Sequence, residues 1–151
     1  MMKKWKTAAC GLIMASFTGC SNSGFLEESP PKAYLEASNR LYETRVGAYC
    51  WKETCVDTAG PSELLKTEKP IKVKANESLS LVIKYKRQPN ERDMVQIQNK
   101  NEVDVPLKKN KMKAPSERGT YYYSYSVWWM DKNLKNVSNG DALYAFVLEV
   151  K

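Results

Sequence analysis

The fold of this chain is decided by TYYYSYSVWWM at residues 120–130 and by ALYAFVLEV at residues 142–150. In the first segment every second residue is aromatic or apolar, so an extended chain turns one set to a common face: Tyr121, Tyr123, Tyr125, Val127 and Trp129. The alternate positions Thr120, Ser124 and Ser126 are small and polar, which is typical of a face turned toward water. Residues 131–141 between the segments are rich in turn-forming types, above all SNGD at 138–141. The two segments predict a long antiparallel hairpin that carries much of the core.

Shorter alternating segments at residues 71–73, 79–85, 94–98 and 103–107 predict further strands. Together with the hairpin they give roughly seven to nine short strands with frequent turns, so we expect an all-β, antiparallel β-sandwich. Pro61 suits the first position of a single helical turn. A basic cluster follows the last short strand and consists of Lys108, Lys109, Lys111, Lys113 and Arg118. We expect it to form a solvated loop or, alternatively, to contact anionic lipid headgroups.

Residues 33–45 are ambiguous between two structures. Their apolar positions could form one face of a helix, or SNR at 38–40 could be a turn between strands at 33–37 and 41–46. We favour the hairpin, because Thr44, Val46 and Tyr49 prefer strands.

The segment PSERGTY at residues 115–121 resembles the corner of immunoglobulin-like domains, in which a tyrosine hydroxyl bonds back to the corner backbone. The resemblance implies that Tyr121 is the corner tyrosine and that the sandwich is immunoglobulin-like. Tyr123 stands where an antibody-type domain places its second cysteine, so the usual disulfide between the sheets is absent. The alternative is a generic buried aromatic strand.

The N-terminus predicts export. Three lysines precede an apolar run at residues 7–17, which at about 16 Å of helix is too short to span a bilayer and is typical of a signal peptide. The run ends in SFTGC at residues 16–20, which resembles a bacterial lipoprotein box, although Phe17 replaces the usual leucine. The resemblance implies that Cys20 is acylated, as with palmitate, and anchors the protein to a membrane. An ordinary signal peptide that happens to end near a cysteine is the alternative.

These features divide the chain into a signal peptide at 1–19, a flexible tether at 20–31 and one sandwich domain at 32–151. Cys50 and Cys55 are then the remaining cysteine pair, and in an exported protein they predict a disulfide rather than a redox-active or zinc site. The net charge is +7, and loss of Lys3, Lys4 and Lys6 with the signal lowers it to +4. So mild a charge on an exported protein does not favour nucleic acid as a partner.

Other segments extend the lipoprotein resemblance. GAYCW at 47–51, CVDTAGP at 55–61 and GDALYAF at 140–146, together with residues 121–129, are similar to small exported lipoproteins of Bacillus-type Gram-positive bacteria. The resemblance covers most of the chain after the signal. It implies an extracytoplasmic location and a fold, and it supplies no catalytic residues.

The chain contains no histidine, and no motif pairs two carboxylates, so we expect neither an enzyme nor a resident metal or cofactor, and a cell-envelope enzyme is the least favoured alternative. A binding or accessory module is the better hypothesis. Trp128 and Tyr122 alternate with the core positions and should point outward, where they could contact a cell-wall glycan or an envelope protein, unless the neighbouring loop covers Trp128. Trp51 lies in the disulfide loop, which an inhibitor or partner subunit could present.

Overall fold

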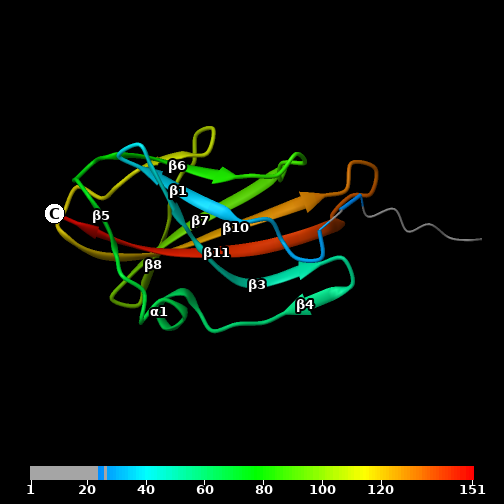
Figure 1. Cartoon of the computed structure of the whole chain (residues 1–151), viewed down its shortest axis with the longest axis horizontal. Helices are drawn as coiled ribbons and strands as arrows, with labels where there is room; N and C mark the ends of the chain where they lie inside the picture. The colour runs from blue at the N-terminus through cyan, green and yellow to red at the C-terminus, as the bar shows by residue number, and fades with distance from the viewer. Residues whose placement is uncertain (1–23, 26) are drawn as a thin grey trace, which may run out of the picture.

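The long hairpin forms the centre of the larger of two sheets (Figure 1). The computed structural model describes residues 24, 25 and 27–151. The hairpin strands β10 (Gly119–Met130) and β11 (Ser138–Val150) pair along their whole length, from Gly119 opposite Val150 to Met130 opposite Ser138. The other elements of the described chain are β1 (Ala33–Ala37), β2 (Arg40–Glu43), β3 (Arg45–Trp51), β4 (Thr54–Val56), α1 (Pro61–Leu64), β5 (Ile71–Val73), β6 (Ser78–Ile83), β7 (Glu91–Gln98), β8 (Asn101–Asp104) and β9 (Lys111–Lys113).

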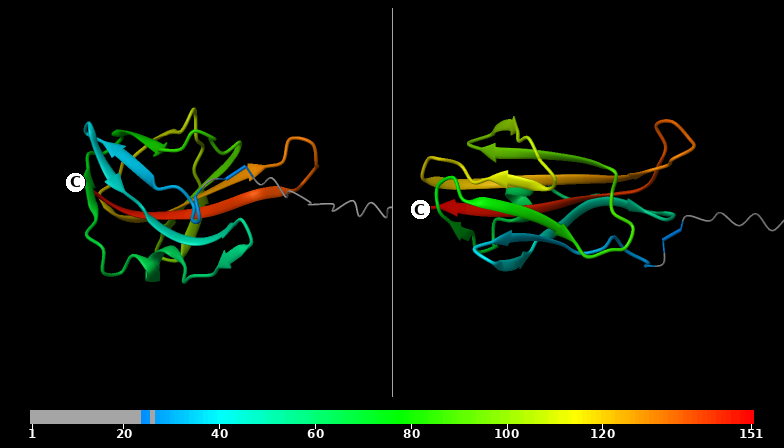
Figure 2. Two further views of the ribbon diagram at one scale, coloured as in Figure 1. Left: turned by 45° about the vertical axis from the view of Figure 1, so that its right-hand side comes forward. Right: turned by 90° about the horizontal axis from the view of Figure 1, so that it is seen from above.

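Two sheets pack face to face, and the expected all-β sandwich is confirmed (Figure 2). The smaller sheet has the order β2-β1-β6-β9, and the larger has the order β4-β3-β11-β10-β7-β8. β5 also belongs to the larger sheet, where it pairs in parallel with the last residues of β11. Because β3 pairs with the first half of β11 and β5 with its end, β11 changes partner along its length.

The core lies between the sheets and is rich in aromatic side chains. The alternation of β10 places Tyr121, Tyr123, Tyr125, Val127 and Trp129 inward, and each is at most 4% exposed. The ring of Tyr123 stacks on that of Phe146 with centroids 4.8 Å apart. Such rings bury large apolar areas, so this layer provides much of the hydrophobic stabilisation. The smaller sheet contributes aliphatic residues from the facing side: Leu35, Leu79, Leu81 and Ile83.

The immunoglobulin-like arrangement is present in the strand order. The neighbours β7, β10 and β11 occupy the places of strands C, F and G, and β1, β6 and β9 those of A, B and E. The predicted corner is confirmed, because the Tyr121 hydroxyl donates a hydrogen bond of 3.0 Å to the backbone carbonyl of Glu117. The elements β2, β3, β4 and α1 are an insertion between the first strand and β5.

The preferred hairpin at residues 33–45 is also confirmed. Ser38 and Asn39 form its two-residue turn with positive φ angles of 49° and 61°. The second strand is shorter than predicted, because it ends at Glu43 and the chain passes to the other sheet at Thr44. The buried Thr44 holds this corner, since its backbone N–H and its hydroxyl both donate to the Ala33 carbonyl, at 3.0 and 2.8 Å.

Three strand predictions need correction. The described chain has eleven strands rather than seven to nine, because the inserted β2–β4 are short and paired only locally. Residues 138–141 are part of β11 and not of the turn, which lies at 131–137. The basic cluster is not wholly a loop: β9 runs through it and buries Met112, while its lysines alternate outward. The helical turn beginning at Pro61 is confirmed.

The segment before β1 differs from the predicted flexible tether. Phe25 is only 6% exposed and stacks on Trp51 with centroids 4.0 Å apart. Farther along, the Glu27 carbonyl accepts a hydrogen bond from the Trp51 indole, and the Pro31 carbonyl accepts one from the Tyr144 hydroxyl. The segment therefore contacts the sandwich at residues 25, 27 and 31, while the side chains of residues 27–29 are exposed. The predicted signal peptide and Cys20 lie outside the described residues.

Candidate functional site

One row of paired residues crosses the outer face of the larger sheet, which is the face turned away from the smaller sheet. Trp128 on β10 pairs with Asp141 on β11, Asp141 pairs with Cys50 on β3, and Cys50 pairs with Cys55 on β4. Directly paired residues point to the same side of a sheet, so the four side chains lie side by side over about 14 Å. The predicted disulfide is confirmed, since Cys50 and Cys55 are bonded.

An open hollow of about 450 Å³ lies over this row. Beyond the row itself, the residues that line it include a second carboxylate and a hydroxyl: Ala48, Tyr49, Val56, Asp57, Ser126, Val127, Ala142 and Leu143. Of these, Val127 and Ala142 are buried members of the core between the sheets. This volume falls within the range of small-molecule sites, which usually pair an apolar lining with a few polar groups.

The two carboxylates of the hollow are positioned by backbone N–H groups. One oxygen of Asp141, Oδ1, accepts from the Cys50 N–H at 3.3 Å, and Oδ1 of Asp57 accepts from the Thr58 N–H at 2.9 Å. These bonds restrict the rotation of both carboxylates. The hollow therefore contains two carboxylates, which can accept hydrogen bonds from hydroxyl and N–H groups of a ligand.

Trp128 and Tyr122 point to the outer face as predicted, but their surroundings differ. Trp128 is half-buried in the wall of the hollow. Tyr122 packs against a small apolar cluster of Leu65, Ala145 and Val147, over which α1 and the residue after it lie. α1 therefore covers one end of the outer face and leaves the end with Trp128 open (Figure 1).

The prediction that Trp51 contacts a ligand at the surface is wrong. Its side chain is 0% exposed, because β3 turns it inward against Phe25 and Trp129. Gly140 lies directly opposite, and a Cβ there would come within 2.9 Å of the indole ring. Lys52 in the same turn is paired with Glu28 at 2.8 Å. The disulfide loop thus supports the core with its aromatic residue and does not present it.

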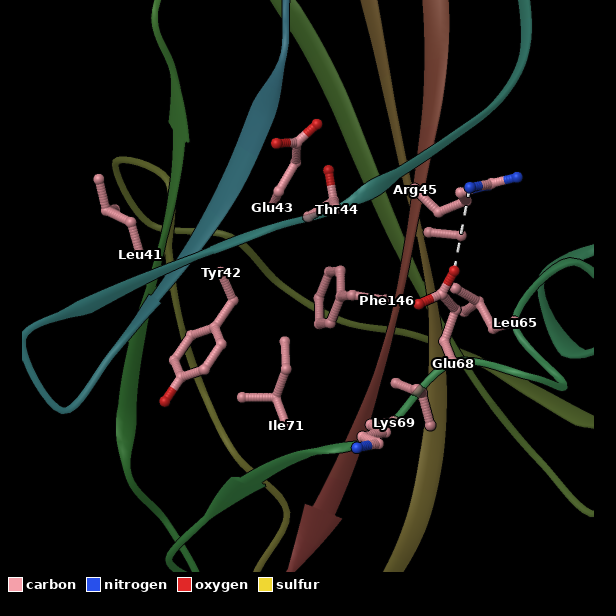
Figure 3. Close-up of a pocket in the computed structure, with 12 residues that line it drawn as sticks. Leu41, Tyr42, Glu43, Thr44, Arg45, Leu65, Glu68, Lys69, Ile71 and Phe146 are labelled. Atoms are coloured by element: carbon pink, nitrogen blue, oxygen red, sulfur yellow. Dashed lines mark ion pairs between the residues drawn. The ribbon is translucent and has the colours of Figure 1, made fainter.

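A second hollow, of about 480 Å³, lies where β11 changes partner from β3 to β5 (Figure 3). Phe146 is among the residues that line it but is only 2% exposed, and Ile71 and Tyr42 are other apolar members. Its charged groups include Arg45 and Glu68, which form an ion pair at 3.9 Å. The two hollows have similar volumes, so volume does not identify the better candidate site. Their side chains do differ, because only the first hollow contains a half-buried tryptophan together with two carboxylates.

The sequence did not point to Asp57, Asp141 or Ser126 as site residues. The signal for Asp141 was the pairing of the hairpin, because a turn at 131–137 places Asp141 opposite Trp128. Because residues 138–141 were assigned to the turn, the pairing of Asp141 with Trp128 was not predicted.

Within residues 24, 25 and 27–151, no three His, Cys, Asp or Glu side chains come together as a metal site. The same part of the chain has no helix of the length and apolarity needed to cross a bilayer. Comparisons with protein-family models, with curated proteins and with solved structures gave no match for the chain.

Proposed function

We propose that this protein is an extracytoplasmic lipoprotein that acts as a binding module, with the hollow beside Trp128 as its ligand site and a cell-wall glycan as its ligand. The observation that carries the proposal is the row Trp128–Asp141–Cys50–Cys55 on the uncovered end of the outer face. A rigid sheet presents these groups, so little conformational entropy is lost when a ligand binds.

The chemistry of the hollow supports a glycan. A sugar ring has a face of C–H groups that packs on an indole ring, and its hydroxyls donate to carboxylates. Trp128 offers the ring, Asp141 offers an acceptor directly beside it on the next strand, and Asp57 offers a second acceptor in the lining of the same hollow. An acidic lining disfavours a strongly anionic ligand, because like charges at close range repel.

The lipoprotein part of the proposal is supported by the sequence of residues 1–20, with its basic start, short apolar run and Gly19-Cys20. An acyl chain contributes about 0.8 kcal/mol for each buried methylene, so two or more chains hold a protein on a membrane essentially permanently. Such an anchor would keep the module next to the wall polymers that it binds.

Titration calorimetry with soluble glycan oligomers prepared from bacterial cell wall tests the ligand site. We expect Trp128→Ala to weaken binding at least about tenfold, the loss of roughly 1.4 kcal/mol. Trp128→Phe keeps an aromatic face and should retain most of the affinity. Val103→Ala, at an exposed position of β8, is the control that should change nothing.

Equal affinity of the wild type and Trp128→Ala would refute the site. If the glycan does not bind and a purified envelope protein binds in a Trp128-dependent way, the ligand class is wrong but the site stands. The anchor is tested separately, since Cys20→Ser should move the protein from the membrane fraction to the medium or the soluble envelope fraction.

A further inference from the structure

The loop that joins β10 to β11 carries exposed apolar and cationic side chains together. Leu134 is 59% exposed and Val137 is 41% exposed, and both are among the most exposed large apolar residues of the described chain. Lys132 and Lys135 alternate with them and are also exposed. Apolar tips bordered by lysines are unfavourable in water alone and suit the boundary between lipid headgroups and acyl chains.

The loop is held in shape by its own hydrogen bonds. Asp131 accepts from the backbone N–H groups of Asn133 and Leu134, at 2.8 and 2.9 Å, and its N–H donates to the Val137 carbonyl at 2.7 Å. Asn90 from the preceding loop fastens the base, since it bonds both the N–H and the carbonyl of Met130. The apolar side chains are thus presented by a preformed loop, which lowers the entropy cost of docking.

The position of this loop relates it to the N-terminus. The segment that leads into β1, blue in Figure 2, starts at the end of the sandwich from which the β10–β11 loop projects, whereas the C-terminus lies at the opposite end. Phe25 packs on Trp129, near the base of the hairpin, with ring centroids 6.0 Å apart. Twenty-three residues precede Gly24, and the proposed acylation site is among them. A membrane that held Cys20 would therefore be near this loop.

We propose that the 131–137 loop docks on an anionic phospholipid bilayer, with Leu134 and Val137 in the headgroup region and Lys132 and Lys135 against the phosphates. Two acidic groups at this end do not oppose such a contact, because Glu28 is paired with Lys52 and Asp131 is turned into its own loop. Basic side chains near a membrane surface are attracted by anionic lipid. The inference rests on the proposed membrane tethering but not on the glycan site.

Hydrogen–deuterium exchange of the full chain tests the docking on vesicles of phosphatidylcholine with and without phosphatidylglycerol. We expect the peptide that covers residues 131–137 to exchange about fivefold more slowly, or slower still, on the anionic vesicles only. Leu134→Asp should abolish this protection. Val103→Asp is the matched control, because Val103 is 57% exposed but lies on β8, and it should leave the protection intact.

Charge reversal provides a second pair of variants. Lys132→Glu with Lys135→Glu should remove the protection, whereas Lys69→Glu with Lys72→Glu, beside and on β5 near the C-terminus, should keep it. All variants share the same N-terminal segment, so differences at 131–137 report the loop alone. Protection that is equal on both vesicle types, or that survives Leu134→Asp, would overturn the inference. A failure of Cys20→Ser to release the protein would instead refute the anchor.

Discussion

Three buried tyrosines should make this fold unusually sensitive to alkali. Tyr123, Tyr125 and Tyr144 lie between the sheets and are at most 1% exposed. Burial disfavours tyrosinate and raises the pKa of each above its usual 10.0, although Arg92 partly opposes the shift at Tyr125. Above pH 10 the unfolded chain loses these protons and the folded chain keeps them. The stability that they contribute is therefore complete below about pH 10 and is lost as the pH rises toward the raised pKa values.

The size of the effect follows from the number of protons. Each tyrosine that ionises only in the unfolded chain lowers the free energy of unfolding by about 1.4 kcal/mol per pH unit, so three lower it by about 4 kcal/mol per unit. Over two units above pH 10, Tyr123 and Tyr144 thus remove about 5 kcal/mol, and Tyr125 adds to this loss. The whole stability of a typical domain is about 5–15 kcal/mol, so we expect the sandwich to lose most of its stability by about pH 12.

Urea unfolding at a series of pH values measures this slope, and Tyr144→Phe is the informative variant. It removes one of the three protons, so its slope above pH 10 should fall to about 3 kcal/mol per unit. At neutral pH it should cost about 1–3 kcal/mol, because the Pro31 carbonyl loses the buried hydroxyl that donates to it at 2.5 Å. Identical slopes for the two proteins would refute the reasoning. So would a spectroscopic titration in which every tyrosine of the folded protein ionises near pH 10.

Three other perturbations have defined outcomes. Tyr121→Phe removes the corner hydrogen bond to the Glu117 carbonyl and should cost about 1 kcal/mol in urea unfolding, with no change in the secondary structure seen by circular dichroism. Replacing both Cys50 and Cys55 by serine should cost roughly 2 kcal/mol in the same assay, because a short closed loop regains its freedom in the unfolded chain. Backbone N–H groups hold the pKa of Asp131 below its usual 3.8. The 131–137 loop should therefore be intact above pH 3.8 and loosen as the pH falls through the lowered pKa. Amide exchange rates in the loop, corrected for the pH dependence of the intrinsic rates, would detect this loosening.

The parts of the fold that sequence predicted are those with a strong local pattern. Alternation at residues 120–130 and 142–150 predicted most of β10 and β11, and the resemblance of residues 115–121 to an immunoglobulin-like corner predicted the bond of Tyr121. The strand preference of Thr44, Val46 and Tyr49 favoured a hairpin over a helix at residues 33–45, and the structure has that hairpin. In each of these places the local preference and the tertiary structure agree.

The errors arose where tertiary contacts override local preference. Residues 138–141 have the composition of a turn, yet Gly140 is needed in β11 because the indole ring of Trp51 leaves no room for a Cβ. Trp51 itself sits in a short loop between cysteines, which suggested exposure, but Phe25 stacks on it from a segment predicted to be a tether. No local pattern indicates a contact between residues this far apart in sequence.

The candidate site combines the central hairpin of the sandwich with strands from the segment between β1 and β5. Trp128 and Asp141 come from the central hairpin, which any domain of this architecture needs for its core, whereas Cys50 and Cys55 come from the insertion between β1 and β5. Without β3 and β4 the hollow would have one wall, and Trp128 would lie on a flat sheet face. The disulfide fixes that second wall, so the double serine variant should weaken glycan binding even under conditions where the protein remains folded. Unchanged affinity in a folded double variant would show that the insertion stabilises the fold without shaping the site.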